Sequence, residues 1–574
     1  FAAANYFDNV QNIEAITVGN TNTVVTITTQ DTLVAAGATL TLTTAANSGV
    51  LTFNGAAETD GTFNITGGSS NDIITGGSGN DTLSGGNGTN NITAGLGNDT
   101  LSGGTGSDTF TLAAVTGLTS ADIVNGSTGT DTVALTGNTA FTATNDFDNV
   151  QNIEAITLGN TNTAVTITTQ DTLVAAGATL TLTNAANSGV LTFTGAAETN
   201  GVFNITGGSG NDNITGGAGN DILAGGTGSD TLVGGTGNET FTFAAVTGLT
   251  SADVVDGGTG TDTIALTGNT AFAAANYFDN VQNIEAITVG NTNTVVTITT
   301  QDALVAAGAT LTLTTAANSG VLTFNGSADT DSVFSITGGT GNDSITGGAG
   351  NDTLAGGTGN DTLVGEGGND TITTGAGTDS ITGGAGADTI TLGSSGNDNT
   401  RQTAIYTSVS DGAAAGANNG ADTITQFDAN ANTATDDLIK ITGTFKTSLD
   451  DDSDSILDYS VSNGNDLGDQ AIIGGANQEA TVLLDAELEV VLADFTTSGL
   501  ANLIAELGEE IDFTAIATGE EHLFIMNFSP TQTAVVNYTA GSGGDDVIVA
   551  TDIQILGIVT HNDGSGLVAN DLTF

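Results

Sequence analysis

The chain has 574 residues and carries 64 Asp and Glu against 3 Lys and Arg, a formal net charge of −61. Residues 1–400 contain no Lys, Arg or His. This excludes direct binding to nucleic acid, and binding to an anionic membrane through protein charge, because both need a basic surface. There is no Cys, so disulfides contribute nothing to stability.

The sequence favours a repetitive fold over a disordered acidic chain, because 38% of its residues are hydrophobic and these recur at fixed intervals. No run of 18 apolar residues is present, so no segment is expected to span a membrane as a helix. No basic n-region followed by an apolar h-region is seen, and thus no cleavable signal peptide is visible.

A long repeat organises the first part of the chain. The segment FDNVQNIEAIT begins at Phe7, Phe147 and Phe278, and each copy is followed by a Gln-Asp pair at 30–31, 170–171 and 301–302. In the first copy, short β-branched segments at 24–29, 39–44, 50–53 and 62–66 predict strands spaced like the rungs of a solenoid. A short helix is expected at 31–36, ended by Gly37.

A glycine-rich block closes each copy, at residues 67–111, 207–242 and 338–391. The blocks repeat every nine residues and hold five, four and six nonapeptides. Position eight of the nonapeptide is apolar in all fifteen, which predicts an inward-facing residue on a short strand. Four residues depart from the glycine pattern without shifting the register: Ser70, Ala94, Glu366 and Thr374.

Position six of the nonapeptide supplies the candidate metal ligands. It is Asp in thirteen repeats, Asn in one and Glu in one: Asp72, Asp81, Asn90, Asp99, Asp108, Asp212, Asp221, Asp230, Glu239, Asp343, Asp352, Asp361, Asp370, Asp379 and Asp388. Glycine turns expose backbone carbonyls, and carboxylates add anionic oxygens. An oxygen-only set suits a hard cation, and Ca²⁺ accepts six to eight such ligands in flexible geometry.

Two nonapeptides make one coil, so residues 18 apart are expected to stack, as with Asp81 and Asp99. Asn90 would lie between Asp72 and Asp108 and offer a neutral oxygen, which predicts weaker sites there. The alternative is a metal-free solenoid in which Gly-Asn-Asp only forms Asx turns.

These nonapeptides resemble the calcium-binding repeats of the RTX (repeats-in-toxin) family. The resemblance implies an all-β parallel β-roll that binds many Ca²⁺ ions. Repulsion between carboxylates would keep the repeats unfolded where calcium is scarce, and calcium outside the cell would couple binding to folding.

The predicted domains are three solenoid modules, here called module 1 (residues 1–140), module 2 (141–271) and module 3 (272–396), followed by a C-terminal domain at 397–574. In that domain, strands are expected at HLFIMNF and TAVVNY, and one short amphipathic helix at 498–508. Residues 421–441 and 534–574 resemble the post-repeat and terminal segments of type I secretion substrates. This resemblance implies an extracellular or cell-surface location.

No enzyme is predicted, since the chain has neither an HExxH motif nor a GxSxG elbow. The EEH sequence at 520–522 is expected to be a turn before a strand. Near-identical modules suit a self-assembling structural protein of a surface layer or filament, and the alternation resembles calcium-dependent S-layer proteins. The alternatives are a biofilm or surface adhesin that binds cell-surface polysaccharide, and the C-terminal part of an RTX enzyme.

Overall fold

A computed structural model describes residues 7, 9–19, 24–44, 49–113, 117–137, 140–141, 146–159, 163–184, 188–244, 248–268, 271–272, 274, 276–290, 295–315, 320–393, 402–406, 422–427, 438–441, 521–529, 532–539, 553–561 and 572–573. These residues form strands and turns, with no helix among them. None of the described elements is therefore a helix that could cross a membrane. The chain divides into two compact units, unit 1 (residues 1–266 and 280–284) and unit 2 (267–279 and 285–574).

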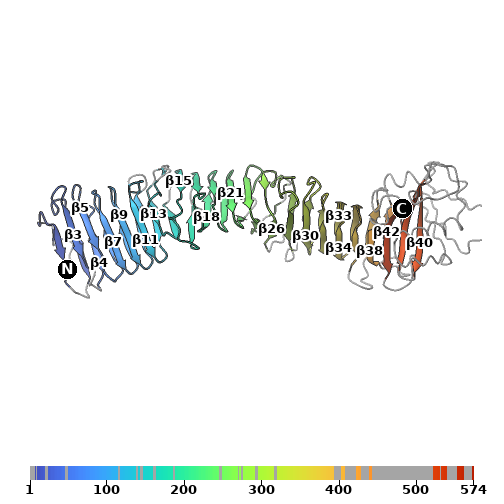
Figure 1. Ribbon diagram of the computed structural model, residues 1–574, viewed down its shortest axis with the longest axis horizontal. Helices are drawn as coiled ribbons and strands as arrows, with labels where there is room; N and C mark the ends of the chain where they lie inside the picture. Colours follow the sequence, from blue (N-terminus) through green and yellow to red (C-terminus); the bar gives the residue numbers. More distant parts are fainter. Residues whose placement is uncertain are drawn as a thin grey trace, which may run out of the picture. The chain divides into compact units, whose positions relative to one another are not determined.

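Unit 1 is a coil with two sides, and successive strands alternate between them (Figure 1). Side 1 carries the odd-numbered strands: β1 (Ala15–Thr17), β3 (Thr39–Thr43), β5 (Thr62–Thr66), β7 (Thr82–Asn87), β9 (Thr100–Thr105), β11 (Ile123–Thr128) and β13 (Val150–Gln151), then β15 (Val165–Thr168), β17 (Leu191–Thr194), β19 (Asn213–Thr215), β21 (Thr231–Thr236), β23 (Val254–Thr259) and β25 (Val281–Gln282). Val165 of β15 also forms a parallel bridge with Phe141, which lies between β12 and β13.

Side 2 of unit 1 carries the even-numbered strands: β2 (Val25–Thr28), β4 (Leu51–Asn54), β6 (Ile73–Thr75), β8 (Asn91–Thr93), β10 (Thr109–Ala113), β12 (Thr132–Thr136), β14 (Ala155–Leu158), β16 (Thr179–Thr183), β18 (Val202–Gly208), β20 (Ile222–Gly226), β22 (Thr240–Phe243) and β24 (Thr263–Leu266). All strand pairs on both sides are parallel, and each strand pairs with the strand one coil away. This is the parallel β-roll that the nine-residue period predicts.

The side that a segment occupies depends on how many nonapeptides precede it. The first AIT segment forms β1 on side 1, whereas its copy in module 2 forms β14 on side 2. The block of module 1 contains an odd number of nonapeptides, five, and each nonapeptide crosses the coil once. Equivalent segments of modules 1 and 2 therefore lie on opposite sides of unit 1.

Unit 2 repeats the same construction. One side consists of β26 (Ala286–Val289), β28 (Thr310–Thr314), β30 (Val333–Gly339), β32 (Thr353–Thr358), β34 (Thr371–Ala376), β36 (Thr389–Thr391) and β38 (Asp422–Phe427). The other consists of β27 (Val296–Thr299), β29 (Leu322–Asn325), β31 (Ser344–Thr346), β33 (Thr362–Gly367), β35 (Ser380–Ala385), β37 (Thr403–Tyr406), β39 (Leu438–Ile441) and β43 (Leu572–Thr573).

An antiparallel extension follows the parallel coils of unit 2. It consists of β40 (Glu521–Ser529), β41 (Gln532–Thr539) and β42 (Ile553–His561), and β42 pairs in parallel with β38. The strands predicted at HLFIMNF and TAVVNY correspond to β40 and β41. The helix predicted at 498–508 lies outside the described residues.

The core is a column of apolar side chains between the two sides. In the first block, Leu83 pairs in register with Leu101, which pairs with Val124, and all three are at most 1% exposed. All fifteen residues at position eight belong to this core. Burying one such side chain stabilises the fold by about 1.5–3 kcal/mol. Pairs of Phe add edge-to-face contacts, as between Phe53 and Phe63 with centroids 5.0 Å apart.

The helix predicted at 31–36 is wrong. Leu33 N–H donates to the Gln30 carbonyl and Ala38 N–H to the Ala35 carbonyl, which makes two separate turns rather than a helical ladder. Leu33 and Val34 are buried by this arrangement. The need to turn the chain between β2 and β3 outweighs the local helical propensity.

Candidate calcium sites

The glycine turns bring backbone carbonyls of successive coils close together. The second glycine of the motif has a left-handed backbone, as at Gly86 (φ 89°) and Gly104 (φ 107°). A Cβ on Gly104 would overlap the Gly86 carbonyl oxygen. Glycine is therefore required here both by the backbone conformation and by the close approach of the next coil.

The residues at position six form a ladder along each edge of the coil. The backbone N–H of one ladder residue donates to the side-chain oxygen of the residue 18 positions later, at N···O distances of 2.7–2.9 Å. The pairs include Asp81 with Asp99, and Asn90 lies between Asp72 and Asp108. The stacking expected from the 18-residue spacing is thus present in the structure.

The second carboxylate oxygen of each ladder residue points toward the glycine turn. A Cβ built on Gly338 would touch both Asp343 Oδ2 in its own turn and the Gly356 carbonyl oxygen one coil later. The same pair of contacts occurs at Gly67, with Asp72 Oδ2 and the Gly85 carbonyl oxygen. Each turn therefore gathers carboxylate and carbonyl oxygens from two coils, a donor set that fits Ca²⁺.

Burial leaves several of the ladder carboxylates with one oxygen that the protein does not pair. All fifteen position-six residues are at most 2% exposed. The Oδ2 atoms of Asp230, Asp343, Asp361 and Asp370 are buried and have no hydrogen-bond partner. Buried anionic oxygens in this state are costly unless a cation is bound. The residues present thus fit the metal ion that the nonapeptide implies.

The pKa values of the ladder carboxylates also show the effect of this burial. Burial is the main cause that raises the pKa of Asp343 to about 6 and of Asp99 to about 7. Burial and the neighbouring charges of Asp388 and Asp352 raise the pKa of Asp370 to about 8. Burial, then the charge of Asp262, raises the pKa of Glu239 to about 8. Each shift means that the folded chain without metal disfavours the charged form of the carboxylate, which a bound cation would favour.

The ladders extend beyond the residues that the nonapeptide spacing identifies. Asp99 N–H donates to Asp122 Oδ1 at 2.6 Å, and Asp108 N–H to Asp131 Oδ1 at 2.8 Å, both across 23 residues. Four further residues continue the ladders of the other blocks: Asp253, Asp262 and Gln402 across 23 residues, and Asp422 across 34. An Asp in the phrase AD(I/V)V, at 121–124 and 252–255, is the sequence signal that would have found two of them.

Comparison with known families supports the same assignment. A family model described as the RTX calcium-binding nonapeptide repeat matches residues 64–92, 84–114, 206–240, 246–267, 335–363, 355–390 and 364–399. No curated protein matches the chain. The matched segments overlap all three glycine-rich blocks, and the stretch at 246–267 includes Asp253 and Asp262. The three glycine-rich blocks are therefore calcium-binding nonapeptide repeats of the RTX kind, which form a β-roll and bind Ca²⁺ at multiple sites.

Proposed function

We propose that this is a secreted structural protein that folds on binding calcium outside the cell and then assembles with copies of itself into a surface layer or filament. Proteins with RTX repeats are typically secreted. The observation that carries the proposal is the repetition, almost verbatim, of one module along the chain. A lateral contact made by one module can recur at the next, and repetition strengthens weak contacts through effective concentration.

The distribution of charge in unit 1 is compatible with such contacts. The residues of β3, β5, β7 and β9 that are not buried are Thr, Ser, Asn and Gly. The ladder carboxylates are instead buried at the turns between the strands. Once calcium neutralises the turns, the neutral strand surfaces can approach one another without a large electrostatic cost.

Calcium would also control where the protein folds. In a cell with little free calcium, the unpaired carboxylates disfavour the coil and leave the chain unfolded for export. Outside, binding of many ions supplies the missing free energy of folding, because the sites exist only in the folded state. The C-terminal resemblance to type I secretion substrates fits this route.

The proposal assigns no catalytic role to the chain. Residues 1–400 contain no Lys, Arg or His, and the carboxylates at position six of their repeats are accounted for as calcium ligands. The proposed partners are other copies of the chain. Cell-surface polysaccharide is the ligand expected if the protein is instead an adhesin.

The test is static light scattering with electron microscopy of the purified full chain across a calcium titration. We expect monomers in chelator, ordered sheets or filaments at millimolar calcium, and dispersal when chelator is added back. A folded protein that stays monomeric at millimolar calcium and binds one glycan tightly would replace this proposal with the adhesin function.

A further inference from the structure

The turn before the first glycine-rich block contains a buried carboxylate that belongs to no nonapeptide. Glu58, between β4 and β5, is 0% exposed. Its Oε1 accepts the Gly61 N–H at 3.0 Å, while Oε2 is buried and has no hydrogen-bond partner. Residues 1–400 contain no Lys, Arg or His that could pair with it. A buried anionic oxygen of this kind calls for a cation from outside the chain.

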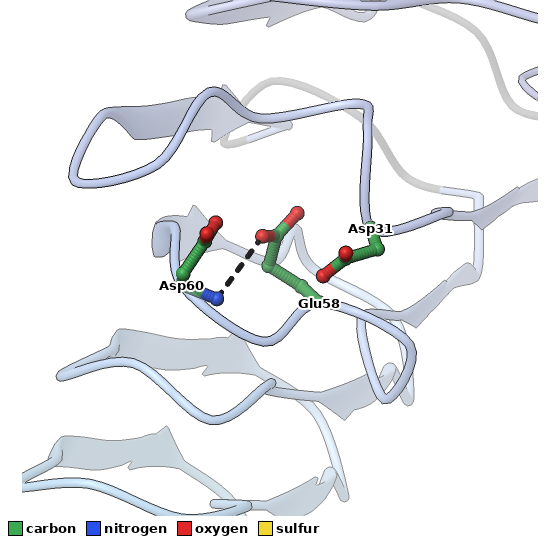
Figure 2. Close-up of side chains that lie close together, drawn as sticks. All are labelled: Asp31, Glu58 and Asp60. Carbon is green, nitrogen blue, oxygen red and sulfur yellow. Dashed lines mark hydrogen bonds between the residues drawn. The ribbon is translucent and has the colours of Figure 1, made fainter.

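Two exposed carboxylates complete a cluster around Glu58. Asp31 comes from the turn between β2 and β3, and Asp60 follows Glu58 in its own turn. One oxygen from each of the three residues lies within 4.8 Å of the others. Figure 2 shows the three side chains gathered at this edge of the coil. Asp31 is held in place, since its Oδ1 accepts the Thr59 N–H at 2.9 Å.

Module 3 builds the same cluster from different side chains. Asp302, Asp329 and Asp331 have oxygens within 4.8 Å of one another, and Oδ2 of the buried Asp329 has no hydrogen-bond partner. Asp329 is one methylene shorter than Glu58, and Ser332 stands where module 1 has Gly61. A Cβ on Gly61 would lie 2.7 Å from Val34 Cγ1 and 3.1 Å from Glu58 Oε1. In module 3 the buried Oγ of Ser332 adds another oxygen without a hydrogen-bond partner.

Module 2 retains the buried acid but changes one exposed ligand. Oε2 of Glu198 is again buried without a hydrogen-bond partner, and Asp171 Oδ1 accepts the Thr199 N–H at 2.9 Å. The position of Asp60 is occupied by Asn200. The chain therefore contains its own comparison, with three carboxylates in modules 1 and 3 and two in module 2.

We propose that Asp31, Glu58 and Asp60 bind a calcium ion, that Asp302, Asp329 and Asp331 bind a second one, and that module 2 has a weaker version of this site. The three anionic ligands, all oxygens, and the partly open geometry suit Ca²⁺. The cluster lies outside the matched repeats, which begin at residues 64, 206 and 335. The proposal does not depend on self-assembly.

The position of this site gives it a structural role. Ser78 N–H donates to the Glu58 carbonyl at 3.0 Å, so the Glu58 turn lies directly next to the glycine turn that carries Asp81. The residue one coil before Asp81 is Phe63, whose N–H donates to Asp81 Oδ1 at 2.7 Å. Phe63 offers no carboxylate, and Glu58 supplies one instead. The new site therefore closes the end of the calcium ladder.

The test exchanges the module 1 and module 2 ligands in the full chain. Asn200→Asp should create a third strong site, and Asp60→Asn should weaken the first by on the order of tenfold, because calcium affinity rises with ligand charge. Both positions are exposed, so the fold should tolerate the changes. Glu14→Gln, which removes an exposed acid outside the cluster, is the matched control.

Bound ions are counted by native mass spectrometry, and affinities are measured by calorimetry with calcium and with magnesium. We expect one more calcium in Asn200→Asp, one fewer in Asp60→Asn at limiting calcium, and no change in Glu14→Gln. Wild-type counts and affinities in both cluster variants would overturn the proposal. An added ion seen with magnesium but not with calcium would overturn the assignment to Ca²⁺.

Discussion

Replacing Asn90 with Asp should destabilise the metal-free fold but strengthen the binding of calcium. Asn90 is 2% exposed, and its Oδ1 accepts the Asp72 N–H at 2.9 Å. Its own N–H donates to Asp108 Oδ1 at 2.8 Å, while Nδ2 only reaches the Gly88 carbonyl at 3.4 Å. An Asp would keep both ladder bonds and place a second anionic oxygen where Nδ2 lies.

The size of the effect follows from an Asp already in a ladder. Burial, as the main cause, raises the pKa of Asp99 from 3.8 to about 7. At 1.36 kcal/mol per pH unit, a difference of about 3 corresponds to about 4 kcal/mol, and screening by solvent reduces this to roughly 2 kcal/mol. Asn90→Asp should therefore destabilise the metal-free fold by about 2 kcal/mol. In calcium, it should raise the affinity of the adjacent sites by on the order of tenfold.

Calorimetry of calcium binding, together with the calcium midpoint of folding by circular dichroism, measures both effects. Asn91→Asp is the control, because Asn91 is the neighbouring residue and is exposed on β8. The variant should raise the affinity and the control should not. Equal affinities for wild type, variant and control would refute the conclusion that ladder carboxylates are calcium ligands.

Three further predictions concern metal, pH and backbone strain. Chelation should abolish most of the β signal in circular dichroism, and millimolar calcium should restore it; an unchanged spectrum would contradict calcium-coupled folding. Burial chiefly raises the pKa of Asp81 to about 6 and of Asp370 to about 8, so the metal-free fold gains stability as the pH falls through these values. In chelator, the β signal should therefore increase from pH 8 to pH 5, whereas calcium affinity measured by calorimetry should decrease. Glu366 has φ 74° where the motif has glycine, so Glu366→Gly should stabilise the calcium-bound fold by about 1 kcal/mol in thermal denaturation. Glu366→Gln, which keeps the strain, should give no such gain.

The periodic part of the structure could be predicted from the sequence because each nonapeptide specifies one strand and one turn. The apolar residue at position eight and the acid at position six occur at fixed spacing, so a stack such as Leu83 with Leu101 follows from counting alone. The strands at 39–43 and 62–66 were equally clear from alternation of Thr with apolar residues.

The nine-residue spacing does not identify the functional residues that lie where the repeat is interrupted or absent. Asp122 and Asp131 join the ladders across 23 residues, because five extra residues are accommodated in the intervening turn. Glu58 reaches its edge from a turn outside the nonapeptides, so no repeat pattern includes it. The segment at 31–36 has helical propensity but must turn between two strands, a constraint that a local pattern does not contain.

The odd number of nonapeptides in the first block also decides at which edge of unit 1 each turn lies. The Glu58 turn connects side 2 to side 1, whereas the equivalent Glu198 turn connects side 1 to side 2. Within unit 1, adding or removing one nonapeptide therefore moves the segments that follow to the opposite side of the coil. A change of two alters the length of the coil and leaves these segments on the same side. Recombination between near-identical blocks can change the number of nonapeptides from odd to even, and this change, rather than the change in length, decides which side the following segments occupy. In this way evolution can move the same loops to the opposite edge while the apolar side chains of the core keep the same kind of neighbours.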